Sequence, residues 1–239
     1  MVIPALDEAA WIAEVVERVP GFVDVVVLVD DGSRDDTAQR ARRAGDGRLV
    51  VLRNEAPRGV GAAIVAGYRA ALARGAGVIA VMAGDGQMDP ADLEGVVRPV
   101  VEGRADYVKG DRFAHPDVIR TMPLARHAAG RAFAWATRVA AGLPRLSDSQ
   151  CGYTAIGAAA LARLDLDALW PSYGYPNDLL GALAREGLRI DEVTVRPVYR
   201  GEASGIRPWH VLTVGWLIGR IAVRRAASRL SLERQPAEQ

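Results

Sequence analysis

The chain has 239 residues, half of them hydrophobic and a quarter charged, which is enough for one large domain with a substantial core. Its formal net charge of +1 gives no overall field that would favour nucleic acid or an acidic partner. A single cysteine, Cys151, excludes an internal disulfide framework and indicates a reducing compartment. Asp7 and Glu8 interrupt any apolar region near the start, so we expect no signal peptide, and no apolar run approaches the roughly 20 residues of a membrane-spanning helix.

Strand and helix patterns alternate over the first part of the chain. Apolar runs with β-branched residues predict strands at 1–4, 23–29, 48–52 and 77–82, and "ADYVKG" at 105–110 is read as a further strand. Helical patterns lie between them, at 7–19, 33–45 and 60–73, with a further helix beginning at Pro90. Ser33 and Asp36 have the spacing of a capping box, and Asp89 before Pro90 predicts a helix cap with a first-turn proline. This order predicts an α/β fold with a mostly parallel sheet and helices on both faces.

The rhythm changes after about Arg112. A long helix is predicted over 123–142, a second begins within "YGYPNDLLGALAREG", and "LRIDEVTVRPVYRG" has the alternation of a strand. We expect a main domain over 1–208, a C-terminal amphipathic helix over 209–230 and a flexible tail over 231–239.

Three acidic turns follow three of the predicted strands. They are "DE" after the first strand, "DDGS" after the second and "GDGQMD" after the fourth. One such turn alone is well explained by helix capping. Ligands of open parallel sheets bind beyond the carboxyl ends of the strands, so three acidic turns at one edge favour a ligand site.

Seven segments then occur in a recognisable order: "VIPALDEA", "VDDGSRDDT", "GVGAAIVAG", "GDGQMDP", "VKGDRF", "DSQCGYTAI" and "YGYPNDLL". Together they resemble family 2 glycosyltransferases of the GT-A fold, close to the branch that transfers mannose or glucose to polyprenol phosphate. The resemblance covers roughly residues 1 to 208. The "VDDGSRDDT" segment with the acidic turn downstream is its most specific part.

The resemblance implies a nucleotide-sugar donor and a set of donor contacts. By this analogy Pro4, Asp7 and Glu8 line the nucleoside, Asp30 contacts the base, and Arg112 of "GDRF" faces a phosphate. Asp7 stands where the family often has asparagine. A planar guanidinium can clamp a phosphate through two hydrogen bonds, although a surface salt bridge would explain Arg112 equally well.

The turn "GDGQMDP" corresponds to the family's metal motif, Asp-x-Asp-x-Gln. Its first position here is Ala83, which leaves Asp85 and Gln87 as the metal ligands that the resemblance implies. The cation would be Mg²⁺ or Mn²⁺, which take oxygen ligands and complete their shell with phosphate and water. Asp89 is explained better as a helix cap than as a ligand.

On the acceptor side, the resemblance draws attention to Asp178 at the start of a helix. An acidic residue there can act as a base toward an attacking hydroxyl. A lipid phosphate is already ionised and needs no base, in which case Asp178 would orient acceptor or sugar; a simple helix cap is the other explanation. Asp148 is expected on the same acceptor-side wall, and Cys151 as a small buried side chain.

The C-terminal helix 209–230 combines aromatic and aliphatic residues with arginines such as Arg220. It is too short and too charged to span a bilayer, so it either lies in a membrane interface or packs on the core or on a second subunit. Arg200 and Arg207, in the segment before it, are expected to reach a donor phosphate.

The function expected from these features is metal-dependent transfer of a sugar, with inversion, from a GDP- or UDP-sugar to a polyprenyl phosphate. The location would be cytoplasmic, peripheral on the inner face of the cell membrane, and a homodimer stays open. The alternatives are transfer to a soluble hydroxyl acceptor and a non-catalytic nucleotide-sugar binding module. A dinucleotide-dependent oxidoreductase is excluded because the first strand ends in "PALDEA" and not in a glycine-rich turn. The glycines of "GVGAAIVAG" are expected to allow close helix packing.

Overall fold

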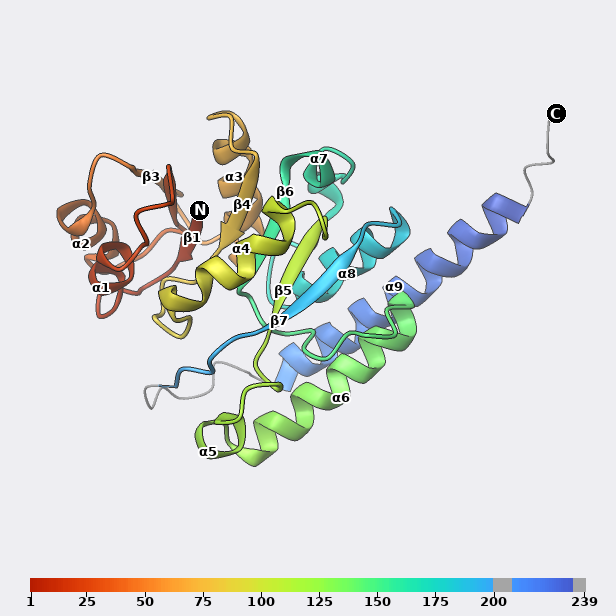
Figure 1. Cartoon of the computed structure of the whole chain (residues 1–239). Helices are drawn as coiled ribbons and strands as arrows, with labels where there is room; N and C mark the ends of the chain where they lie inside the picture. The colour runs from red at the N-terminus through yellow and green to blue at the C-terminus, as the bar shows by residue number, and fades with distance from the viewer. Residues whose placement is uncertain (200–207, 234–239) are drawn as a thin grey trace.

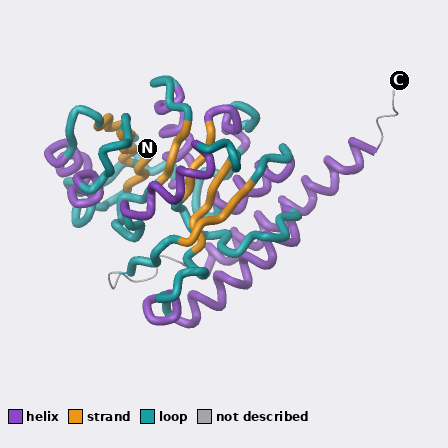
Figure 2. Tube along the Cα trace, in the orientation of Figure 1, coloured by secondary structure: helices purple, strands orange, loops and turns teal. Residues whose placement is uncertain are grey.

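The structure is a computed structural model that describes residues 1–199 and 208–233; for residue 208 and residues 229–233 it describes the backbone alone. Within this part of the chain, the strands form a seven-stranded sheet in the order β3-β2-β1-β4-β6-β5-β7. The strand bounds are β1 (Val2–Ala5), β2 (Val26–Asp30), β3 (Leu49–Arg53), β4 (Val78–Val81), β5 (Tyr107–Asp111), β6 (Thr154–Gly157) and β7 (Ile190–Thr194). The mostly parallel α/β sheet predicted from the sequence is confirmed (Figures 1 and 2).

Helices connect the strands and cover both faces of the sheet. Their bounds are α1 (Ile12–Glu17), α2 (Thr37–Ala44), α3 (Val60–Leu72), α4 (Leu93–Val101), α5 (Val118–Thr121), α6 (Leu124–Ala141), α7 (Ala158–Leu161), α8 (Tyr175–Arg185) and α9 (Pro208–Glu233). Two short 3₁₀ turns, η1 (Pro90–Asp92) and η2 (Leu166–Ala168), precede α4 and α8. Helices α1, α2 and α4 contribute to the core on one face of the sheet, and α3, α7 and α8 to the core on the other.

Helices α6 and α9 form an outer layer against α8 (Figure 1). Ala140 and Ala141 of α6 are buried against Ile221 of α9, and Val214 and Leu217 of α9 are also buried. One side of α9 therefore belongs to the folded body, as the packing alternative for this helix predicted.

The glycines of "GVGAAIVAG" sit at close contacts of α3. A Cβ added to Gly67 would lie 2.3 Å from a methyl of Val2 on β1, and one added to Gly61 would lie 2.3 Å from the carbonyl oxygen of Trp170. The prediction that these glycines allow close helix packing is confirmed. The segment is part of the scaffold and not a dinucleotide loop.

Strand β6 is absent from the sequence prediction. It runs antiparallel to both β4 and β5, and pairs Thr154 with Val81 and with Lys109. Because it reverses direction, β5 is again parallel to β4, and its carboxyl end returns to the edge at which β1, β2 and β4 end.

The predicted capping box at Ser33 is wrong. Helix α2 begins at Thr37, its cap residue Asp36 makes no side-chain capping bond, and the hydroxyl of Ser33 accepts a hydrogen bond from the backbone N–H of Asp7 instead. The helix predicted over 7–19 is likewise shorter, because residues 7–9 are held in a loop by α2 side chains and its preceding turn.

Candidate active site

The loops that follow β1 and β2 are joined by four hydrogen bonds between backbone and side chain. Besides the Ser33 bond, Thr37 accepts from the N–H of Glu8, Asp35 accepts from the N–H of Ala9, and Asp7 accepts from the N–H of Arg34 at 2.7 Å. Asp7 has a φ of 57°, a left-handed conformation that aspartate and asparagine adopt more readily than most residues. Because both residues adopt this left-handed conformation, Asp7 can occupy a position where the family that the sequence resembles often has asparagine.

The two aspartates of "DDGS" have different environments. Asp30 ends β2 and is fully buried; its Oδ1 accepts from the N–H of Ser33 at 2.8 Å, while its Oδ2 lies 3.5 Å from Nε of Arg53. That Oδ2 has no hydrogen-bond partner among the described residues. Asp31 accepts from the N–H groups of Arg58 and Gly59, at 2.9 and 2.7 Å, and so fixes the loop before α3.

The loop after β4 carries the expected metal motif. The carboxylate of Asp85 accepts from the N–H of Gln87 at 2.9 Å, which closes a tight turn. Asp89 caps the next turn through the N–H of Ala91 at 3.1 Å, as predicted, and also pairs with Arg18, the residue that follows α1, at 2.9 Å. The cap and the ion pair therefore hold Asp89 between η1 and the end of α1.

A cleft of about 520 Å³ brings the loops after β1, β4 and β5 together with the end of α5, with α6 and with the start of α8. Its polar lining includes Glu8, Asp85, Gln87 and Arg112, which were predicted at the donor site, and Gln150, which was not, whereas the predicted Pro4, Asp7 and Asp30 do not line it. Its apolar and aromatic lining was not predicted, and it includes Ile64, Phe113, Met122, Phe133, Tyr173 and Tyr175. A smaller hollow of about 40 Å³ also touches Asp85, Gln87 and Arg112.

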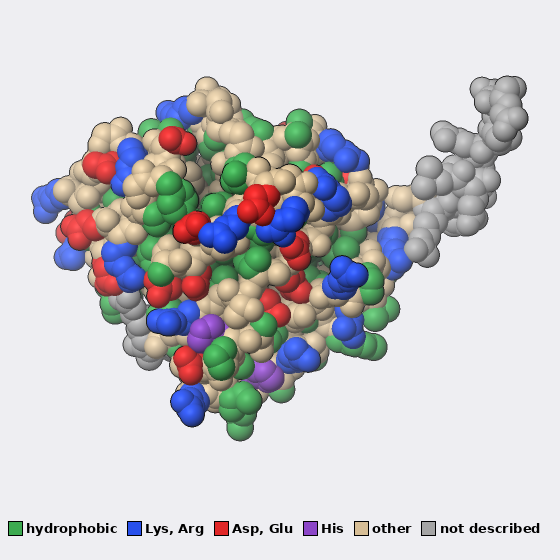
Figure 3. All heavy atoms as spheres, viewed as in Figure 1, with side chains coloured by type: hydrophobic (Ala, Val, Ile, Leu, Met, Phe, Trp, Pro, Cys, Tyr) green, Lys and Arg blue, Asp and Glu red, His purple; other side chains and the backbone are tan. Residues whose placement is uncertain are grey.

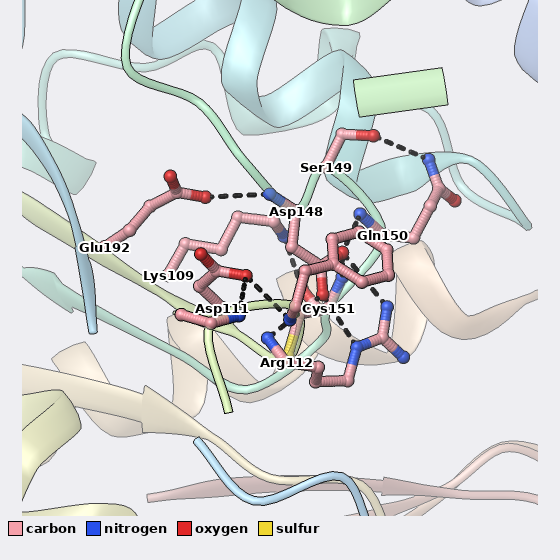
Figure 4. A network of polar contacts seen from close by, with 10 residues as sticks. Lys109, Asp111, Arg112, Asp148, Ser149, Gln150, Cys151 and Glu192 are labelled. Carbon is pink, nitrogen blue, oxygen red and sulfur yellow. Dashed lines mark hydrogen bonds and ion pairs between the residues drawn. The ribbon is translucent and has the colours of Figure 1, made fainter. Parts of the chain in front are cut away.

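Arg112 lies at this cleft but is already paired. Its Nε donates to Oδ2 of Asp148 at 2.7 Å and its Nη2 donates to Oδ1 at 3.0 Å, a two-pronged contact with a fully buried carboxylate (Figure 4). The surface salt bridge considered for Arg112 is therefore a mostly buried one, with 18% of the Arg112 side chain exposed. Asp148 lies behind Arg112 and does not line the cleft, contrary to its expected place on the acceptor-side wall.

More buried charge lies behind Arg112 (Figure 4). Lys109, the single lysine of the chain, is fully buried and its Nζ donates to the carbonyl of Cys151, while burial lowers the pKa of its ammonium. Burial would raise the pKa of Asp148, yet the Arg112 and Lys109 charges hold it below its usual value. Burial raises the pKa of the Glu192 carboxyl, which accepts from the N–H groups of Ser147 and Asp148.

Asp178 is turned away from the cleft. It is buried in the first turn of α8, where its Oδ2 accepts from the N–H of Trp170 at 2.9 Å and lies 2.6 Å from Nη2 of Arg220 on α9. Its neighbours Tyr175 and Pro176 line the cleft, whereas Asp178 does not. The structure thus gives Asp178 an ion-pair partner that the sequence analysis did not identify.

Pro4 is buried in β1, and its carbonyl accepts from the N–H of Gly84 in the metal-motif loop at 3.1 Å. Arg200 and Arg207 lie outside the described residues. Among the residues that the structure describes, no three or more His, Cys, Asp or Glu side chains are grouped so that they could hold a metal ion by themselves. Nor does any described helix have the length and apolarity needed to cross a membrane.

A family model described as "Glycosyl transferase family 2" matches residues 1–170 of this chain. An undecaprenyl-phosphate mannosyltransferase of Micrococcus luteus is 35% identical over 178 residues, which is 73% of this chain and 72% of the relative. A UDP-N-acetylglucosamine–dolichyl-phosphate N-acetylglucosaminyltransferase of Methanococcus voltae is 26% identical, over 83% of this chain and 85% of the relative.

Solved structures agree on the fold. Glucosyl-3-phosphoglycerate synthase of Mycobacterium tuberculosis, crystallised with Mn²⁺, UDP-glucose and phosphoglyceric acid, superimposes with a TM-score of 0.67 at 23% identity, over 93% of this chain and 78% of that one. The arrangement of strands and helices described above is therefore shared with a glycosyltransferase of known structure.

Proposed function

This chain belongs to glycosyl transferase family 2, and we propose that it transfers a sugar, with inversion, from a GDP- or UDP-sugar to a polyprenyl phosphate. The observation that carries the proposal is the mixed lining of the 520 Å³ cleft at the carboxyl edge of the sheet. Carboxylate, amide and guanidinium groups suit a pyrophosphate and a sugar, while Phe113, Met122 and Phe133 suit the first isoprene units of a lipid acceptor. Relatives whose names specify polyprenyl-phosphate acceptors support this choice.

The donor's nucleoside would lie over the joined loops of β1 and β2, against Pro4, Asp7, Glu8 and Asp30. Oδ2 of Asp30, which has no hydrogen-bond partner among the described residues, would be a suitable acceptor for an N–H of the base. Arg112 would contact a phosphate from the cleft wall. Arg200 and Arg207 are proposed as further phosphate contacts from the segment before α9.

The residues of the β4–α4 loop fit a hard divalent cation. Asp85 and Gln87 both line the cleft, and one carboxylate with one amide oxygen is the small protein contribution that Mg²⁺ or Mn²⁺ accepts when substrate phosphates and water complete the shell. When bound, the cation would neutralise the charge that grows on the leaving nucleoside diphosphate. The methyl group of Ala83 adds no ligand, so metal and nucleotide are expected to bind together.

A phosphate acceptor also fits the position of Asp178. An ionised phosphate oxygen attacks the sugar carbon directly from the face opposite the leaving group, so no side chain has to remove a proton. A base would have to face the cleft, and Asp178 instead pairs with Arg220. The chain's own contribution would then be to orient the phosphates of donor and acceptor, and to exclude water with the apolar and aromatic lining of the cleft.

We further propose that α6 and α9 contact the membrane that carries the acceptor. Trp135 on α6 and Leu212 on α9 are 61% and 75% exposed, and Trp209, Trp216 and Val223 on α9 are more than half exposed. Residues 124–141 and 208–228 contain six arginines and no acidic residue, in a chain whose net charge is +1. Exposed aromatic and aliphatic groups beside arginines are typical of helices that lie on anionic membranes.

The test is a transfer assay with UDP-glucose, UDP-N-acetylglucosamine and GDP-mannose, each with Mn²⁺, and with a short polyprenyl phosphate or phosphoglyceric acid as acceptor. Labelled sugar should move into the organic phase with at least one donor, and Asp85→Asn should reduce this transfer. Transfer to the soluble acceptor alone would contradict the lipid acceptor. Donor binding without transfer to either would instead support a non-catalytic binding module.

A further inference from the structure

Arg112 reaches the cleft from a neighbourhood that holds its guanidinium in one orientation. Asp148 is the immediate partner: its two oxygens accept from Nε and Nη2 of Arg112, and Oδ1 also accepts from the N–H groups of Gln150 and Cys151 at 3.0 and 3.1 Å. Every one of these bonds needs an acceptor on Asp148. A carboxylate is the side chain that can accept all of them at once.

Asp148 is held in turn by Glu192 of β7. The two Glu192 oxygens accept from the N–H of Ser147 at 2.7 Å and from that of Asp148 at 3.0 Å, which fixes the backbone that carries Asp148. Figure 4 shows the bond to Asp148. Glu192 does not line the 520 Å³ cleft, and no direct contact between it and Arg112 is present among the described residues. Its influence on Arg112 therefore passes through Asp148.

We propose that Asp148 and Glu192 are positioning residues that fix the guanidinium of Arg112 against the cleft, so that its remaining N–H groups meet a phosphate without rearrangement. This inference rests on the proposed function, because it takes Arg112 as a phosphate contact. Lys109 supports the arrangement by adding a second buried positive charge beside the buried carboxylates. A long side chain that is already ordered loses less conformational entropy when it binds.

The substitution Asp148→Asn tests the orientation specifically. In Asp148, Oδ2 accepts from Nε and from the backbone N–H of Arg112. If the NH₂ group of an asparagine takes the place of Oδ2, it faces these two donors with donors of its own, and the guanidinium has to turn away. Removing a charge-assisted contact to a phosphate typically weakens binding by about tenfold to a hundredfold. We expect Asp148→Asn to approach the loss caused by Arg112→Met, and Glu192→Gln to cause a smaller loss.

The measurement is calorimetry of the full chain with UDP and GDP in the presence of Mn²⁺, and with uridine and guanosine as phosphate-free probes. Positioning predicts weaker diphosphate binding, nucleoside binding within about twofold of wild type, and no further loss when Asp148→Asn is added to Arg112→Met. If Asp148 had only a structural role, Asp148→Asn would weaken nucleoside binding as well, and it would weaken diphosphate binding both in the wild-type chain and in the Arg112→Met variant. Asp106→Asn is the matched control, because Asp106 holds Arg189 with the same two-pronged geometry at the opposite end of β5.

The outcomes distinguish the positioning role of Asp148 and Glu192 from the phosphate-binding role of Arg112. Diphosphate affinity in Asp148→Asn that equals or exceeds wild type, together with a loss in Arg112→Met, would overturn the positioning inference alone. Unchanged affinity in Arg112→Met would overturn it together with the phosphate role of Arg112. If Asp148→Asn does not fold, Glu192→Gln and its combination with Arg112→Met decide the question in the same way.

Discussion

Oδ2 of Asp178 lies 2.6 Å from Nη2 of Arg220, and this ion pair joins the first turn of α8 to the middle of α9. The Arg220 guanidinium also lies over the ring of Trp216, which contacts Trp170, and the N–H of Trp170 donates to Asp178. The segment between Trp170 and Asp178 contributes Tyr173 to the cleft wall. Helix α9 is therefore connected to the wall of the site by a compact set of contacts.

Asp178→Asn should lower the free energy of unfolding clearly, but it should change the rate of sugar transfer only modestly. The substitution leaves Arg220, whose side chain is 20% exposed, without its counter-charge, and breaking a buried ion pair typically costs roughly 3 kcal/mol or more. Urea unfolding of wild type and variant measures the change. Transfer per folded molecule should stay within about tenfold of wild type, because the carboxylate does not face the cleft.

Asp167→Asn provides the control for that experiment. Asp167 pairs with Arg69 at 2.8 Å, but its side chain is 84% exposed, so its loss should change the unfolding free energy by less than about 0.5 kcal/mol. A transfer rate that falls by about 10²–10⁴-fold in folded Asp178→Asn would instead identify Asp178 as a general base and favour a hydroxyl acceptor.

The exposed side of α9 should govern membrane binding. The double variant Leu212→Gln, Val223→Gln removes two apolar side chains that are 75% and 69% exposed, so it should leave stability nearly unchanged. Partitioning onto vesicles of anionic phospholipid, measured by sedimentation, should fall by about tenfold because less apolar area is buried in the interface.

Val101→Gln is the matched variant for this comparison, since Val101 is 67% exposed on α4, a helix outside the α6–α9 layer. It should bind vesicles as wild type does. Equal losses in both variants, or a wild-type chain that never sediments with vesicles, would rule out the membrane role of α9 and leave it as a packing helix.

The fold was predictable where the sequence pattern is strong. Apolar runs with β-branched residues identified β1 to β4, and the pattern "ADYVKG" identified β5. Strand β6 escaped prediction because it is four residues of mixed character, "TAIG", and owes its place to pairing with β4 and β5. The start of α1 was misplaced because Ser33, Asp35 and Thr37 hold residues 7–9 in a loop, and no local pattern reveals such contacts.

The site was predictable only as far as its motifs extend. The motifs indicated Asp85, Gln87 and Arg112, and all three line one cleft. The partners of Arg112 and Asp178 could not be predicted, because Asp148 and Arg220 meet them only through tertiary packing. The apolar and aromatic lining of the cleft was missed for the same reason. Its side chains come from α3, the loop after β5, the end of α5, α6 and the start of α8 with the loop before it, and each resembles an ordinary core residue in the sequence.

The raised pKa of Glu192 gives stability a distinctive pH dependence. Between the ordinary value of 4.5 and its raised value, Glu192 holds a proton in the folded chain and not in the unfolded chain. Its contribution to the unfolding free energy therefore falls as pH rises through that window. Glu192→Gln lacks this contribution, so the stability of wild type minus that of the variant should decrease from pH 4 to pH 7 in urea unfolding. A difference that grows with pH would show that Glu192 is stabilised in its charged form.

The "GDGQMDP" turn should bind metal only weakly in the free protein and well when nucleotide is present. Asp85 contributes the carboxylate of this turn to the cleft and Gln87 an amide, so a nucleoside diphosphate has to supply the remaining charge. Asp85→Asn should weaken Mn²⁺-dependent binding of UDP or GDP by at least about tenfold, since disturbing even the residues that support a metal ligand costs that much. Calorimetric titration of Mn²⁺ with and without nucleotide measures both effects.

Two further variants test Ala83, at the first position of the motif, and Asp89, the carboxylate that follows the motif. Asp89→Asn should be mild, because Asp89 caps η1 through the N–H of Ala91, and asparagine caps a helix about as well as aspartate. Ala83→Asp restores the first acidic position of the family motif and should tighten Mn²⁺ binding in the presence of nucleotide, because a second carboxylate reduces the dependence on phosphate charge. Nucleotide affinity that responds neither to Mn²⁺ nor to Asp85→Asn would show that this turn holds no metal, and would make a nucleotide-sugar binding module the better explanation of the cleft.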